Sequence, residues 1–279
     1  MATDSQIEWT DVTWNPSTGC SKVSAGCKFC YAETMATRLK KMGSERYENE
    51  FRFTMHWDKI DQPLSWKKPR KIFVNSMSDL FHEDVSLEFI RAVFDVMQRT
   101  PRHRYQVLTK RPDAMDQILR RLQADGDYTP ASHIWLGTSV EDSRVLGRLE
   151  ALRRVPAEIR FLSCEPLIGP LPPDLDLTGI AWVIVGGESG THLWTERTRE
   201  RRALVDYDYD ESRWKARPER VEWVRDIRDV CRRQSVTFFF KQWGGATAKA
   251  GGRMLDGQTY SEFPSTGSSP GQCAVAAGE

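Results

Sequence analysis

Short apolar runs rich in β-forming residues alternate along the chain with amphipathic stretches. The stretch 87–98 shows helical spacing of its apolar residues at Phe89, Ile90, Val93, Phe94 and Met97. The same reasoning predicts further helices over 32–42, 112–122, 141–154 and 218–233. Predicted strands lie near 9–14 and at 72–74, 105–108, 134–136, 159–162, 181–185 and 236–240.

This order of elements predicts an α/β protein. Apolar strands between helices indicate a parallel sheet that is buried on both faces. A partial or complete α/β barrel fits about seven strands best, and a doubly wound open sheet is the alternative. A length of 279 residues suits one large domain, which we place at 1–245.

Two regions depart from the alternation. Residues 191–215 are charged and lack a clear period, so we expect an exposed insertion, perhaps with a short helix. Residues 246–279 are rich in Gly, Ser, Ala and Thr, so we expect a largely disordered tail.

Polar residues and glycines follow six predicted strands in turn. Each loop alone is typical of an ordinary turn or a helix cap. In a parallel sheet the carboxyl ends share one edge, so together the six loops predict a single polar rim around a site. The loops are 75–79, 109–111, 137–142, 163–166, 186–190 and 241–245.

Three cysteines near the amino terminus carry the clearest chemical signal. Cys20, Cys27 and Cys30 are spaced C-x6-C-x2-C, in a loop that Gly19 and Gly26 allow to fold tightly. Clustered thiols favour a soft metal. A [4Fe–4S] cluster held by three cysteines leaves one iron open to a small molecule, whereas structural zinc normally takes four ligands.

Composition limits the location and the partners of the chain. Forty basic and 39 acidic residues give a net charge of +1, which is no global signature of nucleic-acid binding. The first residues lack a secretory pattern, and no apolar run approaches the ~18 residues of a membrane span. We therefore expect a cytoplasmic protein without membrane contact, whose six cysteines are metal ligands or buried thiols.

The cysteine loop and several distant segments resemble a known family. The pair Cys27-Lys28-Phe29-Cys30 resembles the cluster loop of radical S-adenosylmethionine (SAM) enzymes, although those usually have C-x3-C-x2-C spacing. A fuller resemblance is to the phage-associated three-cysteine-motif family, which is regarded as radical-SAM-like. Its segments occur in order at 7–11, 13–16, 18–20, 26–27, 30–33, 73–81, 108–112, 164–166, 186–190 and 239–244.

The resemblance implies a partial (β/α)6 barrel with a [4Fe–4S] cluster and SAM as co-substrate. In such enzymes the open iron binds SAM, and one electron from a reductase or flavodoxin-type donor releases a 5′-deoxyadenosyl radical that abstracts hydrogen. Phage association suggests a nucleic acid base or nucleotide as substrate, in DNA modification or repair. The rival hypothesis is a zinc-stabilised nucleic-acid-binding module without catalysis.

The resemblance and the rim together assign candidate roles. Cys20, Cys27 and Cys30 would hold the cluster, and Phe29 would shield it and the SAM adenine or simply pack in the core. Lys110 would hold a carboxylate or phosphate, and Cys164 would donate hydrogen, ligate a metal or be an ordinary buried thiol. Candidate SAM-binding residues, each with a structural alternative as a cap or backbone partner, are Ser76, Ser78, Asp79, Thr138, Ser139, Glu141, Glu165 and Glu188.

Basic stretches occur at 66–71 and 197–202, each with an aromatic residue nearby. Such stretches contact phosphates in nucleic-acid-binding proteins. Charge runs are more often solvated faces, so both interpretations stay open.

Overall fold

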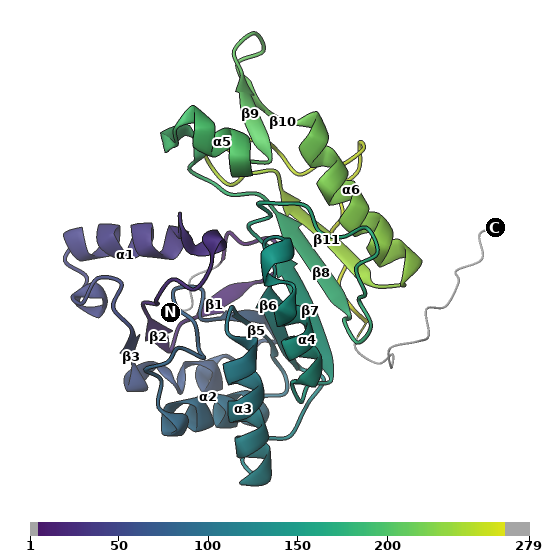
Figure 1. The fold of residues 1–279 in the computed structure, drawn as a ribbon. Coiled ribbons are helices and arrows are strands. Elements are labelled where there is room, and N and C mark those ends of the chain that lie inside the picture. Colours follow the sequence, from purple (N-terminus) through teal and green to yellow (C-terminus); the bar gives the residue numbers. More distant parts are fainter. Residues whose placement is uncertain (1–4, 266–279) are drawn as a thin grey trace.

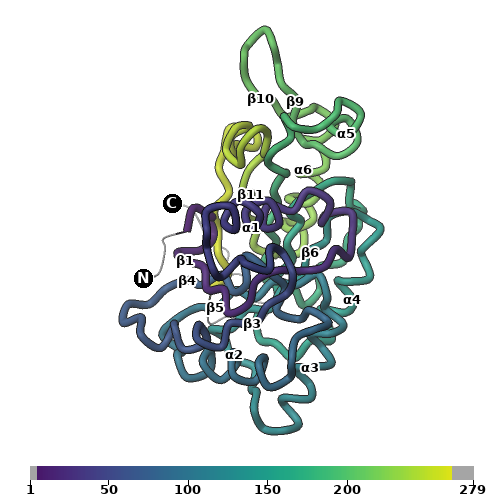
Figure 2. The backbone as a smooth tube through the Cα atoms, turned by 90° about the vertical axis from the view of Figure 1, so that its left-hand side faces the viewer, coloured from purple at the N-terminus to yellow at the C-terminus, as the bar shows by residue number. Residues whose placement is uncertain are grey.

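The computed structural model describes residues 5–265, and its centre is a curled parallel sheet of seven strands (Figures 1 and 2). The strands lie in the order β1–β4–β5–β6–β7–β8–β11, and every neighbouring pair is parallel. The predicted partial α/β barrel is confirmed. The strands are β1 (Val12–Trp14), β4 (Lys71–Val74), β5 (Arg104–Thr109), β6 (Ile134–Ser139), β7 (Ile159–Cys164), β8 (Trp182–Gly186) and β11 (Thr237–Gln242).

Four helices cover the outer face of the sheet: α2 (Leu87–Arg99), α3 (Pro112–Ala124), α4 (Gly147–Arg154) and α6 (Pro218–Arg233) (Figure 1). Ser86 caps α2 by accepting from the amide of Phe89 at 3.2 Å, and proline begins α3 and α6. Their apolar faces join alternate strand residues in the main core, which excludes water from the outer face.

The inner face of the sheet holds a second core of large side chains. By register, Phe73, Gln106, Trp135 and Ile159 lie side by side across four strands. Two layers nearer the carboxyl ends, Ser139, Ser163 and Ile184 are in register. The interior of the half-barrel is therefore filled and largely aromatic at the amino end, and it becomes polar toward the rim.

Smaller elements surround the rim. Helix α1 (Tyr31–Lys41) follows the cysteine loop and stands apart from the outer helices, at the left of Figure 1. The antiparallel pair β2 (Ser17–Thr18) and β3 (Thr54–Met55) lies before and after it in the chain. Single-turn 3-10 helices are η1 (Ala25–Cys27), η2 (Glu45–Tyr47), η3 (Trp57–Lys59), η4 (Gln62–Ser65), η5 (Ser143–Val145) and η6 (Thr191–Leu193).

The segment 191–215, which we expected to be an exposed insertion with perhaps a short helix, has that helix but is more ordered than expected and is buried in places. This segment forms η6, helix α5 (Glu196–Arg202) and a hairpin of β9 (Val205–Asp208) and β10 (Arg213–Ala216). Trp194 and residues 202–205 are buried. The apolar residues among them, Trp194 and 203–205, are too few to form a recognisable pattern among the many arginines and aspartates on either side.

The disorder expected from residue 246 onward is also wrong as far as residue 265. Leu255 and Tyr260 are buried, and Phe263 packs on Trp182 and Phe239 with ring centroids 5.1 and 5.7 Å away. Three well-spaced apolar side chains thus anchor a segment of otherwise loop-like composition. Residues 266–279 lie outside the described residues.

The helix expected over 141–154 begins only at Gly147, because Glu141 and Asp142 are used in side-chain contacts at the rim. Within residues 5–265 no helix has the length and apolar character that crossing a membrane requires.

Candidate functional site: a cysteine loop on the rim of the half-barrel

The cysteine loop crosses the carboxyl-end rim of the sheet. Cys20 follows β2, Cys27 ends η1, and Cys30 is the residue immediately before α1. Gly19 forms a bridge with Ser78, beside the end of β4, and adopts a φ of +82°. A Cβ on Gly19 would lie 2.2 Å from the carbonyl oxygen of Arg52, so only glycine allows this close approach.

Asp79 and Arg111 fix the first cysteine. Arg111 donates to the Cys20 sulfur at 3.5 Å and to the Ser21 hydroxyl at 2.7 Å, and its guanidinium is almost buried. Asp79 accepts from Arg111 at 3.2 Å, and three further donors fill its remaining acceptor positions. These donors are the Phe81 and Lys110 amides and the Thr109 hydroxyl. Asp79 therefore already has four partners within the chain.

Glu141 fixes the middle of the loop. It is 1% exposed and accepts from the Gly26 amide at 3.3 Å and from the hydroxyl of Ser24. Arg148 donates to its other oxygen at 2.8 Å, so the buried charge is paired. A Cβ on Gly26 would lie 2.7 Å from Glu141, which shows how closely the loop approaches this carboxylate.

Arg202, the last residue of α5, also contacts the cysteine loop. It donates to both oxygens of Glu188, at 2.6 and 2.5 Å, and to the Ala25 carbonyl at 3.1 Å. Its guanidinium also lies over Phe29, 5.0 Å from the ring centroid, and Phe29 stacks on Trp194 at 4.4 Å. Burial raises the pKa of Glu188, against the opposing effect of Arg202. Sequence reasoning missed Arg202 and Trp194, because they lie in the segment taken for an insertion.

Ser76 and Ser78 belong to a hydrogen-bond network between the ends of β1 and β4. Ser78 lies 2.9 Å from the Ser17 hydroxyl and donates to the Ser17 carbonyl at 3.0 Å. Ser76 donates to Asn15 at 3.1 Å, and its own carbonyl accepts from the Tyr31 hydroxyl. The two serines thus connect the strand ends to the first residue of α1.

Lys110, Ser139 and Glu188 lie near one another on the inner side of the rim, and Glu165 lies beside Gly186 at the end of β8. Lys110 donates to Ser139 at 3.3 Å, and Lys241 pairs with Glu165. Within the described residues Lys110 has no carboxylate partner in an ion pair. Its charge is nevertheless near enough to Glu188 to oppose the rise in the pKa of that carboxyl that burial causes. Ser163, on the same face, has a buried hydroxyl without a hydrogen-bond partner among the described residues.

The side chains of Thr138 and Cys164 lie on the outer face of the sheet, away from the inner side of the rim. Thr138 is fully buried and donates to the Thr109 carbonyl at 2.9 Å. Cys164 belongs to the main core, on the helix-covered face of the sheet near Cys231. Burial raises the pKa of the Cys164 thiol far above its usual range. The structure therefore separates both side chains from the rim and gives Cys164 the surroundings of an ordinary buried thiol.

The three loop cysteines are reduced and partly buried. Burial, followed by the charge of Asp79, raises the pKa of Cys20 to about 11, so a metal must displace its proton. Within residues 5–265, no three His, Cys, Asp or Glu side chains are gathered closely enough to hold one metal ion. Three cysteine thiols are the donor set that a [4Fe–4S] cluster with one open iron takes, whereas structural zinc normally takes four ligands.

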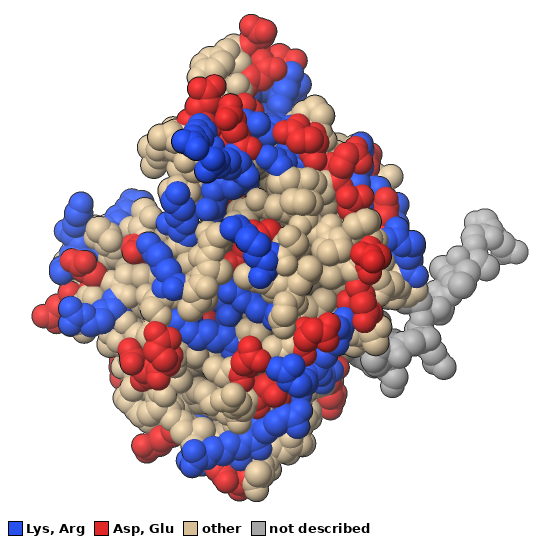
Figure 3. Space-filling view, viewed as in Figure 1, with Lys and Arg blue, Asp and Glu red and all other residues tan. Residues whose placement is uncertain are grey.

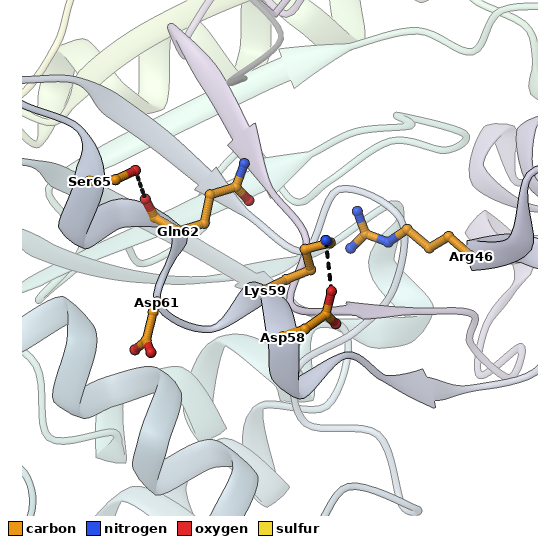
Figure 4. Close-up of a pocket in the computed structure, with 6 residues that line it drawn as sticks. All are labelled: Arg46, Asp58, Lys59, Asp61, Gln62 and Ser65. Atoms are coloured by element: carbon orange, nitrogen blue, oxygen red, sulfur yellow. Dashed lines mark hydrogen bonds and ion pairs between the residues drawn. The ribbon is translucent and has the colours of Figure 1, made fainter.

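Two cavities lie away from the cysteine loop and the rim. One of about 530 Å³ is lined by Arg46, Asp58, Lys59, Asp61, Gln62 and Ser65 (Figure 4). Its charges are mixed, and Lys59 already pairs with Asp58 at 2.7 Å. A second, of about 490 Å³, lies along the β9–β10 hairpin and the start of α6.

Comparison with known proteins shows the family of the chain. The sequence profile of the family described as "Protein of unknown function (DUF5131)" matches residues 4–206 and 210–264. The chain belongs to this family. No curated protein is significantly similar in sequence.

Solved structures of spore photoproduct lyase share the fold. The enzyme complexed with dinucleoside spore photoproduct is 14% identical, with a TM-score of 0.51, over 86% of this chain and 78% of that one. A variant with bound AdoMet and dinucleoside spore photoproduct is 13% identical, with a TM-score of 0.53, over 87% and 79%. A single-substitution variant is 15% identical, with the same TM-score and coverage. At these identities the likeness establishes the architecture of the chain.

Proposed function

We propose that the chain is a radical SAM enzyme that acts on a nucleic acid base or nucleotide. The observation that carries the proposal is the position of the cysteine loop. It lies on the carboxyl-end rim of a parallel half-barrel and is fixed there by Arg111, Glu141 and Arg202. The AdoMet and the dinucleoside lesion present in structures with the same fold support both the co-substrate and the substrate class.

In this proposal Cys20, Cys27 and Cys30 hold a [4Fe–4S] cluster through three of its irons. Such a cluster, when bound, supplies the electron that cleaves SAM and so generates the radical that abstracts hydrogen. The electron comes from a reductase or flavodoxin-type donor. A role in phage DNA modification or repair follows from the resemblance to the three-cysteine-motif proteins.

The remaining residues bind and orient. Lys110, which has no carboxylate partner among the described residues, would hold a carboxylate or phosphate, while Ser139 and Ser163 offer hydroxyls on the same inner face. Glu165 and Glu188 bind SAM or substrate only through the face that Lys241 and Arg202 leave open. Asp79 and Glu141 position Arg111 and the loop, and Phe29 with Trp194 excludes water beside it.

The test is SAM cleavage. The protein is purified anaerobically, reconstituted with iron and sulfide, reduced with dithionite and assayed for 5′-deoxyadenosine. We expect the product from the native chain and from Cys231→Ala, a control that removes a buried thiol away from the loop. We expect none from the Cys20→Ala/Cys27→Ala/Cys30→Ala variant. A colourless protein with tightly held zinc and no cleavage would favour the non-catalytic rival.

A further inference from the structure

The charges around the rim divide into two groups. The buried acids each have a basic partner: Asp79 with Arg111, Glu141 with Arg148, Asp142 with Arg144, Glu165 with Lys241 and Glu188 with Arg202. These pairs contribute no net charge. Exposed charged side chains outside such ion pairs therefore determine the sign of the local potential. In the cysteine loop and on α5 these are three cations, Lys28, Arg197 and Arg201, and two acids, Glu196 and Glu200, which leave a net charge of +1.

Of the three cations, Lys28 lies in the cysteine loop, and the other two lie on α5, the helix whose Arg202 contacts that loop. Lys28, Arg197 and Arg201 are exposed, and none has a carboxylate partner among the described residues. Lys28 precedes Phe29, and its ammonium lies 5.2 Å from that ring. Because Trp194 and Arg202 also contact Phe29, Lys28 is brought close to α5.

Arg197 and Arg201 lie one turn apart on α5, on a different face from Arg202. Two like charges at this spacing repel and weaken a short helix unless something neutralises them. Arg199 and Arg202, in contrast, are used internally by the Trp194 carbonyl and by Glu188. Figure 3 shows basic side chains gathered around the position of α5, above α1, with acidic ones beyond them on the hairpin.

The other basic stretch, 66–71, lies at the edge of the sheet that is opposite the cysteine loop. Lys71 begins β4, so residues 66–71 are at the amino ends of the strands, opposite the rim. Lys71 pairs with Asp11, while Lys67 and Lys68 are exposed. Topology therefore separates two stretches that look alike in the sequence, and places only the α5 stretch beside the cysteine loop.

We propose that Lys28, Arg197 and Arg201 form a phosphate-binding surface, the α5 basic surface, that holds the backbone of a nucleic acid next to the cysteine loop. The choice of a polymeric nucleic acid rests on the proposed function. The binding itself needs neither cluster nor SAM, so it is tested on the protein without them.

The experiment measures binding of a fluorescein-labelled single-stranded 12-mer by anisotropy between 50 and 200 mM NaCl. Each lost phosphate contact reduces the slope of log K against log salt by about 0.7 on single strands. We expect Arg197→Gln/Arg201→Gln to reduce the slope by about 1.4. Adding Lys28→Gln to this variant should reduce the slope by about a further 0.7. At 50 mM salt the triple variant should bind roughly ten- to hundredfold more weakly.

The matched control is Lys67→Gln/Lys68→Gln, which removes two exposed charges at the far edge and should bind like the native chain. Circular dichroism checks that each variant is folded. Equal loss in the control, an unchanged slope in the triple variant, or no salt-dependent binding by the native chain would each overturn the proposal. Binding of adenosine monophosphate but not the 12-mer would overturn the polymeric ligand. SAM cleavage without oligonucleotide binding would reject this surface and leave the enzyme proposal standing.

Discussion

The guanidinium of Arg202 donates to the carbonyl oxygen of Ala25 at 3.1 Å, across 177 positions of the sequence. The same side chain is held by both oxygens of Glu188, at the end of β8. A helix in a segment that reads as an insertion therefore belongs to the support of the cysteine loop. This contact ties the order of the loop to the integrity of α5.

Replacing Arg202 by Gln should lower the free energy of unfolding by roughly 3 kcal/mol, because it leaves the buried Glu188 carboxylate unpaired. Urea unfolding of the metal-free protein measures the loss. Labelling of loop thiols with Ellman's reagent should also become faster. Arg213→Gln breaks an exposed pair with Glu211 and should cost less than about 1 kcal/mol. If the two variants behave alike, Arg202 does not support the loop.

Asp79→Asn distinguishes a positioning role from a role in binding SAM. The carboxylate accepts four hydrogen bonds within the chain, so the amide should lower the free energy of unfolding of the metal-free protein by about 2 to 3 kcal/mol. Asp84→Asn, at an exposed carboxylate two residues after His82, is the control. Unchanged stability in Asp79→Asn together with weaker SAM binding would restore Asp79 as a direct ligand of SAM.

Gly26→Ala tests the close approach of the loop to Glu141. The added methyl group would meet a buried carboxylate that Arg148 holds in place, so the variant should lose about 1 to 3 kcal/mol of unfolding free energy and retain less iron after reconstitution. Gly147→Ala, where a Cβ has open space at the start of α4, should be neutral or stabilised by up to ~1 kcal/mol. Normal iron content in Gly26→Ala would show that the loop can shift without consequence.

Asp256→Asn tests the docking of residues 246–265 on α6. Hydrogen bonds from Arg225 and then Arg228 lower the pKa of Asp256 to about 2. A lowered pKa stabilises the folded chain above pH ~4, and the contribution is lost as pH falls toward 2. Since the pair is partly solvated, we expect about 1 kcal/mol at pH 7. The difference from the native chain in urea unfolding should shrink below pH 4. A difference that persists at pH 2 would contradict this explanation.

Much of the fold follows from local pattern. The helix at 218–233 has the predicted bounds, and the six later predicted strands are each found, most of them longer than expected. Their extra residues are polar ones such as Thr109 and Ser139, which pair with neighbouring strands although their side chains do not signal a strand. Burial in a parallel sheet, which depends on tertiary contacts, decides where these strands end.

The site was only partly predictable. The cysteine spacing and the polar strand ends gave the loop and the rim, but spacing alone does not say which face of a strand a side chain occupies. Alternation along β7 puts Cys164 on the outer face and Ser163 on the inner one, whereas the prediction gave a catalytic role to Cys164 and named Ser163 only as part of the rim loop 163–166. Long-range partners such as Arg202 and Arg148 have no local signal, because their roles depend on contacts made after folding.

The most direct test of the central claim is electron paramagnetic resonance of the anaerobically reconstituted and reduced protein, with and without SAM. A cluster held by Cys20, Cys27 and Cys30 has one open iron, so we predict a reduced-cluster signal that changes shape when SAM is added and is absent from the triple alanine variant. A cluster signal that SAM leaves unchanged, or one that survives the loss of all three cysteines, would contradict the account.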